Sequence, residues 1–433
     1  MLQAQDQLAE HGANARQRHL STFLTYLKYY LGLIVLLVVG ALTSPHSADG
    51  ANIFLSSVNI SDVFRQVANV GVISIGMTLV IITAGIDLSV GAIMGLGSVL
   101  TAMLLTTDGW NRATYASLAL DALAVFAIVF AALGVARGIM RARNTQTTQT
   151  TQSTQTVRVA DRAPVGMQVC IAAIVAALAC AYIALHGGHR MPLLAVMWIV
   201  PLAGFTLGAL NGWIITRGRM QPFIVTLAAM VGVLGAARLI AGQDTAVYSI
   251  YSGTNATTDI EALRALLFSV VPVPALFFLV IAVLVGFVMN RTVFGKYLYA
   301  IGGNEKCAVV SGLDVARHKM AAYAISGLLS ALVGVLYAAQ YRQGKADAGM
   351  GWELDAIAAV VIGGTSLSGG VGRVSGTVAG VLIFGFLSNI LLLNDIDSNT
   401  QLVLKGLIIV IAVFLQQTDV GKHGWFRRFG SKK

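Results

Sequence analysis

Residues that interrupt the apolar stretches of this 433-residue sequence are the first place to look for chemistry. Asp87 stands just after one apolar stretch, ahead of another, and two residues beyond Gly85. An ionisable group in such surroundings is a functional candidate, here as part of a gate. The same aspartate is also a natural N-cap for the helix expected to follow. We prefer the cap to the gate.

A second segment matches the one around Asp87. Ala84–Val99 (AGIDLSVGAIMGLGSV) and Gly363–Val378 (GGTSLSGGVGRVSGTV) share glycine, leucine, serine and valine at equivalent places. Chance could produce this, because these residues are common in apolar helices. We favour an internal repeat whose matched breaks line a pathway. The candidate break or gate residues are Gly85, Asp87, Ser89, Gly91, Gly364, Ser366, Ser368 and Gly370.

The most informative polar segment, residues 291–319, reads RTVFGKYLYAIGGNEKCAVVSGLDVARHK. It predicts a turn at Gly302–Gly303–Asn304, a short helix over Glu305–Ser311 and Gly312 as the C-cap. Asn304 is the predicted N-cap. A short helix held between two long ones is an element that a motor protein could push. An ordinary surface helix fits the same spacing equally well.

Motifs for catalysis or metal binding do not occur in the sequence. It holds no GxxxxGK[ST] phosphate-binding loop and no HExxH motif. Its three cysteines lack metal-site spacing, and its seven histidines are scattered. No nucleophile stands beside a base at a spacing from which catalysis can be argued. We therefore expect no enzyme activity, no metal and no cofactor of the chain's own.

The composition predicts a membrane protein. Hydrophobic residues make up 56% of the chain and charged residues 11%, whereas soluble domains carry about 25% charged residues. We predict an all-α, polytopic membrane fold, with a short tenth span that could be a half-helix. The candidate spans lie near 29–43, 66–84, 88–106, 118–136, 166–185, 193–215, 222–241, 265–289, 320–340, 354–366, 375–394 and 401–416.

The positive charges predict the orientation. The formal charge of +10 could indicate nucleic-acid binding, but the cations lie in short loops, where they set topology. We therefore expect no nucleic-acid partner. An inside N-terminus places most of the 29 lysines and arginines on the inside. The sequence thus predicts a cytoplasmic segment 1–28, a transmembrane region 29–416 and a basic cytoplasmic tail 417–433. Arg238 and Lys405 are expected to anchor outer helix ends.

Five blocks of the sequence resemble one transporter family. GKYLYAIGGNEKCAVVSGLDV contains a pattern similar to the "EAA…G" coupling loop of bacterial importer permeases, at Glu305, Ala308 and Gly312. Cys307 stands where that pattern usually has alanine. With this block, the chain is similar to the ribose/xylose/galactose permease family of ATP-binding-cassette (ABC) importers. The other blocks are Thr83–Leu96, Asn211–Met230, Glu353–Gly372 and Gln401–Val413.

The resemblance implies an import function without catalysis. Such permeases pair, usually as homodimers, in the bacterial inner membrane, and take a monosaccharide from a periplasmic sugar-binding protein. Cytoplasmic ATPase subunits bind the ATP and push the coupling loop. The coupling residues implied here are Gly302, Gly303, Asn304, Glu305, Lys306, Cys307, Ala308, Ser311 and Gly312.

Residues 112–192 match nothing in the family resemblance. They are expected to form an inserted helical hairpin, with a disordered Thr/Gln-rich loop at 144–156 (NTQTTQTTQSTQT). Without the hairpin, about ten core spans remain, the usual number implied by the resemblance.

Sugar contacts cannot be located from spacing. A neutral sugar needs amide or hydroxyl partners and often an aromatic face. The polar candidates for the substrate path are Gln66, Asn69, Ser74, Thr78, Thr226, Ser326, Ser388 and Asn389. The alternative function is an ion-coupled secondary sugar transporter. It would require carboxylates at mid-membrane, whereas Asp87 and Asp121 are predicted near span ends.

Overall fold

The computed structural model describes residues 31–106, 190–241, 247–408, 410–411 and 414. Within these residues nearly all regular structure is helical, which confirms the predicted all-α membrane fold. Shorter apolar helices cover Leu31–Thr43 and α3 (Val90–Thr106). Six helices of the described residues are long and apolar enough to cross a membrane: α2 (Ser57–Ile82), α6 (Leu193–Gly218), α7 (Pro222–Ala241), α8 (Val273–Arg291), α11 (Val315–Tyr341) and α13 (Val374–Leu393).

Helices α2 and α11 are the most buried of the six, and α7 and α8 are the most exposed. In the most apolar 18-residue stretch of each helix, 83% of the residues are buried in α2 and 78% in α11, but only 17% in α7 and 22% in α8. Glycines let α6 approach α11 closely: a Cβ on Gly204 would lie 2.3 Å from the Gly327 carbonyl oxygen. Small residues at a helix crossing allow this backbone proximity, which drives helix association in lipid.

Two of the predicted spans have different limits in the structure. α2 begins at Ser57, well before the predicted start at 66, because Ser56 caps it by accepting a hydrogen bond from the Asn59 backbone N–H. The prediction of a span from 265 was wrong. Residues 265–272 form a hairpin of β2 (Leu266–Leu267) and β3 (Val271–Pro272), and α8 starts behind Pro272. Pro274 then lies in the first turn of α8, where proline fits because its missing N–H has no partner to lose.

The predicted tenth span is a short helix. α12 (Trp352–Ile362) has 11 residues and connects to α13 through residues 363–373. Its shortness agrees with the half-helix interpretation. A further helix covers residues 398–408 near the end of the described chain.

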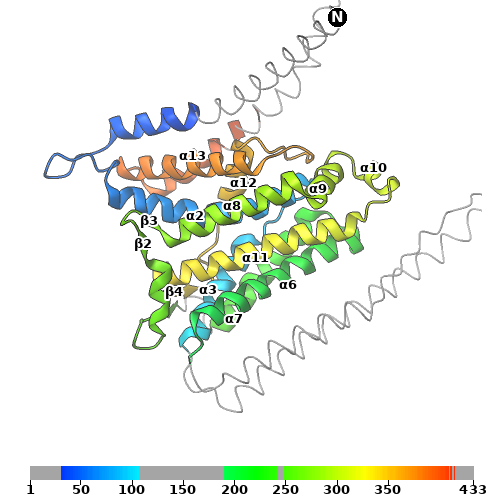
Figure 1. Cartoon of the computed structure of the whole chain (residues 1–433), viewed down its shortest axis with the longest axis horizontal. Helices are drawn as coiled ribbons and strands as arrows, with labels where there is room; N and C mark the ends of the chain where they lie inside the picture. Colours follow the sequence, from blue (N-terminus) through cyan, green and yellow to red (C-terminus); the bar gives the residue numbers. More distant parts are fainter. Residues whose placement is uncertain (1–30, 107–189, 242–246, 409, 412–413, 415–433) are drawn as a thin grey trace, which may run out of the picture.

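Different elements close the two ends of the bundle. At the end on the right of Figure 1 lie α9 (Val293–Gly303) and α10 (Glu305–Val310). At the other end, β1 (Val247–Ser249) pairs antiparallel with β4 (Gln343–Lys345), beside the 3₁₀ helix η1 (Thr258–Arg264).

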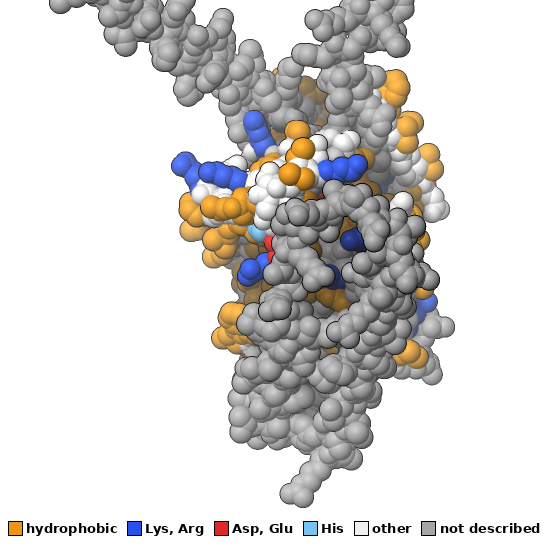
Figure 2. Space-filling model, turned by 90° about the vertical axis from the view of Figure 1, so that its right-hand side faces the viewer, with side chains coloured by type: hydrophobic (Ala, Val, Ile, Leu, Met, Phe, Trp, Pro, Cys, Tyr) orange, Lys and Arg blue, Asp and Glu red, His pale blue; other side chains and the backbone are white. Residues whose placement is uncertain are grey.

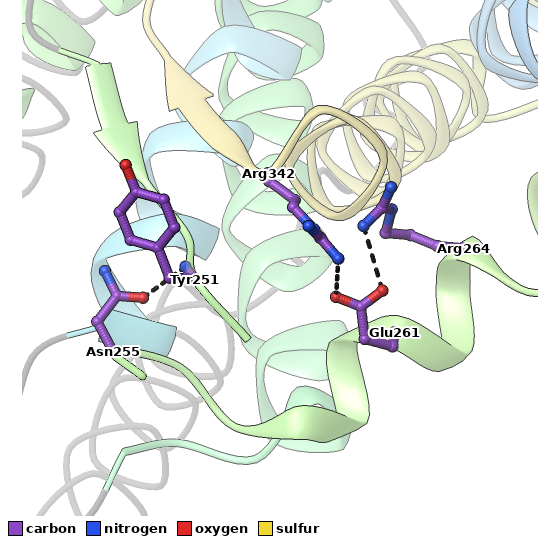
Figure 3. A network of polar contacts seen from close by, with 5 residues as sticks. All are labelled: Tyr251, Asn255, Glu261, Arg264 and Arg342. Atoms are coloured by element: carbon purple, nitrogen blue, oxygen red, sulfur yellow. Dashed lines mark hydrogen bonds and ion pairs between the residues drawn. The ribbon is translucent and has the colours of Figure 1, made fainter. Parts of the chain in front are cut away.

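Polar contacts hold the β-strand end together (Figure 3). The Glu261 carboxylate lies 2.7 Å from the Arg342 guanidinium and 3.2 Å from that of Arg264. The Tyr251 backbone N–H donates to the Asn255 side-chain oxygen at 2.6 Å. The Glu261–Arg342 ion pair ties η1 to the residue that follows α11, and the Glu261–Arg264 pair lies within η1.

Several predicted segments lie outside the described residues. They are the N-terminal segment 1–28, the spans 118–136 and 166–185, the Thr/Gln-rich loop 144–156 and the tail 417–433. The inserted hairpin over 112–192 and the two cytoplasmic termini therefore stay predictions.

Candidate functional site

The short helix α10 forms as the sequence predicts. The Asn304 side chain accepts a hydrogen bond from the Cys307 backbone N–H at 3.0 Å, so Asn304 is the N-cap. Ser311 is the C-cap, and Gly312 follows at φ +82°, a left-handed conformation that favours glycine. One expectation was wrong: Gly302 and Gly303 are the last residues of α9 and not a turn, because α9 stays helical up to Asn304.

One side of α10 is fixed to the protein and the other faces outward. Ala308 is only 4% exposed and clusters with Ile301 and Val315. An ion pair of 2.7 Å links Glu305 to Lys319 of α11. On the outer side Val310 is 88% exposed, and Lys306, Cys307 and Val309 are exposed as well. The helix is therefore held in place while presenting an apolar tip.

The face that carries α10 is basic (Figure 2). Described acidic residues around α10 are Glu305 and Asp314. The described cations on the elements that meet at this end are Arg217, Arg219, Arg291, Lys296, Lys306, Arg317, Lys319 and Arg373.

A junction of glycines connects α9 to both helix breaks. A Cβ on Gly302 would lie 1.7 Å from the Ile82 carbonyl oxygen, at the end of α2. The Gly370 N–H donates to that same oxygen at 2.9 Å. The Tyr299 hydroxyl of α9 donates to the Gly372 carbonyl at 2.9 Å. Since α10 directly follows α9, the helix that carries α10 is in contact with both breaks.

The first break, residues 83–89, centres on Asp87, which is fully buried. Its carboxylate accepts from the Ser89 N–H at 3.0 Å, the Ser89 hydroxyl at 2.6 Å and the Ser326 hydroxyl at 2.9 Å. The Asn211 amide donates to the Ser89 hydroxyl at 2.9 Å. The interpretation of Asp87 as the N-cap of α3 was wrong, because α3 begins only at Val90 and Ser89 stands directly before it. Asp87 instead orders the turn before the helix and ties it to α11.

Two more side chains bind this break. The hydroxyls of Tyr323 and Thr226 both donate to the Ile86 carbonyl, each at 3.3 Å. α6, α7 and α11 thus converge on one short segment.

The second break repeats local bonds of the first. The Ser368 N–H donates to the Ser366 hydroxyl at 3.3 Å, in the place where the Ser89 N–H donates to Asp87. The two breaks also touch: a Cβ on Gly369 would lie 2.8 Å from the Cβ of Ala84. Gly364 and Gly370 adopt φ +83° and φ +72°, whereas Gly91 approaches the Gly349 carbonyl. The matched segments meet in space, as expected of an internal repeat.

The predicted substrate-path residues do not form one group. Ser74 and Thr78 are fully buried and donate to the carbonyls of Val70 and Ser74. Asn389 exchanges hydrogen bonds of 2.7 and 3.1 Å with Asn59, and its neighbour Ser388 is partly buried.

The other candidates divide between two places. Thr226 and Ser326 belong to the first break. Gln66 is exposed, and the amide of Asn69, one turn further along α2, donates to Gln340 at 3.0 Å. The substrate path is therefore not marked by polarity alone.

The sequence analysis did not identify several residues that contact the two breaks. Asn211 and Tyr323 stand out only as polar residues inside apolar stretches, and Tyr299 has no sequence signal at all. The sequence analysis also gave no partner for Lys405, which was expected to anchor an outer helix end; its ammonium group pairs with Asp355 at 3.1 Å. Folding brought a partner to Lys405 that lies far away in the sequence.

The fold defines a multi-pass membrane protein, in which two glycine-rich breaks meet the helix that precedes α10. A family model described as "Branched-chain amino acid transport system / permease component" matches residues 59–148 and 164–413. The match includes both predicted extra spans, 118–136 and 166–185. It leaves out residues 149–163, which begin inside the Thr/Gln-rich loop and extend past its end.

Three curated relatives of the chain are sugar permeases. The chain is 34% identical over 402 residues to the ribose import permease of Bacillus subtilis, covering 92% of this chain and 95% of that protein. It is 30% identical over 398 residues to the ribose import permease of Haemophilus influenzae, covering 90% and 93%. It is 33% identical over 384 residues to the xylose transport permease of Escherichia coli K12, covering 85% and 86%. No solved structure matches the chain.

The chain therefore belongs to the sugar ABC importer permeases of this family, as the five sequence blocks indicated. It is a transport permease and not an enzyme.

Proposed function

We propose that the chain is the translocation subunit of an ABC importer in the bacterial inner membrane. It takes a monosaccharide, such as a pentose, a hexose or a related polyol, and couples to a separate ATPase. The substrate class rests on the ribose and xylose permeases that the chain resembles along most of its length. The cofactor ATP would be bound by the partner.

The observation that supports coupling to an ATPase is the way in which α10 is capped, anchored and exposed. It is capped by Asn304, fixed by the Glu305–Lys319 ion pair and exposed at Val310. A six-residue helix that is held this firmly can transmit a push without unfolding. The glycine junction behind it supports the same role, because it joins α9 to both breaks.

The orientation follows from charge. The basic face around α10 belongs on the cytoplasmic side by the positive-inside rule. Both termini would then be cytoplasmic, and the β1–β4 end would face the periplasm. A periplasmic sugar-binding protein would dock on that outer end. A second permease chain, as a homodimer, would complete the pathway, with lipid around the peripheral helices.

An ATPase pull-down tests the coupling site directly. The permease is purified with its cognate ATPase, and Lys306→Glu with Gly312→Trp is compared with wild type. Loss of the ATPase from the double variant, with the helix content unchanged, supports the proposal. Unchanged ATPase binding and unchanged uptake would contradict it.

The fully buried carboxylate of Asp87 keeps an ion-coupled secondary transporter as the second candidate. Each group that donates to Asp87 is neutral, so a bound cation would find an available charge there. Proteoliposome uptake separates the two functions. ATP-dependent uptake that survives an uncoupler supports the ABC importer, whereas uptake without ATP that collapses with an uncoupler supports the ion-coupled transporter.

A further inference from the structure

Three aromatic side chains gather where α11 ends and α12 begins. The ring of Tyr337 lies 4.5 Å from that of Tyr341 and 6.2 Å from that of Trp352, measured between centroids. Tyr337 is 9% exposed and Tyr341 is 46% exposed. The rings therefore extend from the interior of the bundle to its surface.

Side-chain amides lie beside these rings. The Asn69 amide donates to the Gln340 carbonyl oxygen at 3.0 Å, and the Gln343 amide reaches the Tyr337 hydroxyl at 3.5 Å. Asn69 is 1% exposed, and within the described residues its side-chain oxygen has no hydrogen-bond partner. A buried polar atom in this state is rare in folded proteins and points to a ligand or a strained role.

The group is open on one side. Gln66 is exposed and stands one turn from Asn69 on the same face of α2. Asp62 and Arg65, which pair with each other at 3.1 Å, act electrostatically on Tyr341 from the same helix. The exposed side chains of the group, Gln66 and Tyr341, thus come from α2 and the end of α11, and they are bordered by an ion pair that cancels its own charge.

The group extends from the middle of α2 to the β1–β4 end of the bundle. Asn69 stands 12 residues after the first residue of α2, Ser57, which is about 18 Å along the helix axis. Tyr341 is the last residue of α11 and is followed by β4, so the aromatic part of the group lies at the β1–β4 end of the bundle. Transporters commonly build their substrate sites next to short or broken helices, and Trp352 is the first residue of the short helix α12.

We propose that Gln66, Asn69, Tyr337, Gln340, Tyr341 and Trp352 form a binding site for the ring form of the permeating sugar, here called the amide–aromatic cluster. The amides would exchange hydrogen bonds with ring hydroxyls, and an aromatic face would cover the apolar C–H face of the ring. The site is neutral, so it offers no partner for the ammonium and carboxylate of an amino acid. This inference rests on the proposed function, since it names the substrate contacts of that importer.

Saturation-transfer NMR on the purified full-length permease tests the site, because it detects weak binding without the ATPase or the binding protein. The probes are D-ribose, D-xylose and L-leucine. The test variants are Tyr341→Leu and Asn69→Leu, and Tyr341→Phe is the conservative variant that keeps the ring. Tyr251→Leu is the matched control, since Tyr251 is a 60% exposed aromatic at the same end of the bundle, outside the cluster.

We expect the wild type, Tyr341→Phe and Tyr251→Leu to transfer saturation to the sugars, mainly to the C–H protons of the ring. Tyr341→Leu and Asn69→Leu should each weaken sugar binding about fivefold, the effect of losing one neutral contact. Equal binding by Tyr341→Leu and the wild type would overturn the site. Transfer to L-leucine in place of the sugars would overturn it as well.

The test also separates the site from the proposed function. ATP-driven sugar uptake by the wild-type complex, with no loss of binding in the cluster variants, would refute the cluster and leave the importer standing. Sugar binding that depends on the cluster, without ATP-driven uptake, would support the cluster and contradict the ABC coupling.

Discussion

Gly302→Ala should uncouple the permease from its motor while leaving the docking surface intact. Gly302 lies at the end of α9, and its added Cβ would stand 1.7 Å from the Ile82 carbonyl oxygen and 2.5 Å from the Gly370 nitrogen. Carbon and oxygen atoms that contact each other normally keep roughly 3.3 Å between them. The end of α9 therefore has to move by roughly 1.5 Å away from both breaks.

If α9 keeps its position instead, the new methyl group breaks a buried hydrogen bond. The Gly370 N–H donates to the Ile82 carbonyl at 2.9 Å, in the position that the new methyl group would occupy. A buried donor and acceptor left without partners cost about 1–3 kcal/mol. A loss of this much coupling free energy between α10 and the breaks corresponds to a roughly 5- to 150-fold change in coupled transport. We expect sugar uptake per ATP hydrolysed to decrease by a factor within that range.

The assay compares two neighbouring variants in proteoliposomes that hold the permease, its ATPase and its binding protein. Gly303→Ala is the control, because a Cβ on Gly303 meets nothing within 4 Å. Both variants should bind the ATPase like the wild type, since the exposed side of α10 is unchanged. Gly302→Ala should hydrolyse ATP with little uptake, and Gly303→Ala should transport normally. Equal uptake by the two variants would refute the role of the junction.

Three further predictions concern local structure. Asn304→Ala removes the N-cap of α10 and should cost about 1 kcal/mol of local stability, seen as faster amide exchange over residues 305–310. Phe268→Gly should raise the thermal stability by about 1 kcal/mol, because Phe268 holds φ +52° and is 94% exposed; an unchanged melting temperature would contradict the strain. Asp397 accepts hydrogen bonds from Thr400, which lower its pKa below the ordinary 3.8. This stabilisation is present above pH 3.8 and is lost as the pH falls through the folded-state pKa of Asp397. Hydrogen exchange of the Thr400 amide, relative to its intrinsic rate, should therefore accelerate only in acid.

Much of the helical order could be predicted from the sequence. Long apolar stretches between charged loops predict helices in any lipid environment, because the backbone must satisfy its own hydrogen bonds there. The cap of α10 was predictable from Asn304 and Gly312 alone, since capping depends on a few neighbouring residues. The helix limits were less predictable: Ser56 extends α2, and Pro272 delays α8.

The contacts of the site were not predictable in the same way. Asp87 could be recognised as unusual, but its partner Ser326 lies 239 residues away in the sequence. Lys405 was expected at an anchoring position, and its pairing with Asp355 spans 50 residues. No local pattern encodes such pairs, because they form only when distant helices pack.

The sequence by itself determined the class of this protein: its apolar stretches, basic loops and capped short helix follow from nearest-neighbour physics and require no knowledge of the packing. Only the tertiary structure decided that Gly302, Ile82 and Gly370 meet at one point, and that amides from α2 face aromatic rings from α11. Such meetings depend on which helix surfaces fit against each other at close range. That fit is a property of the whole bundle and of no single segment.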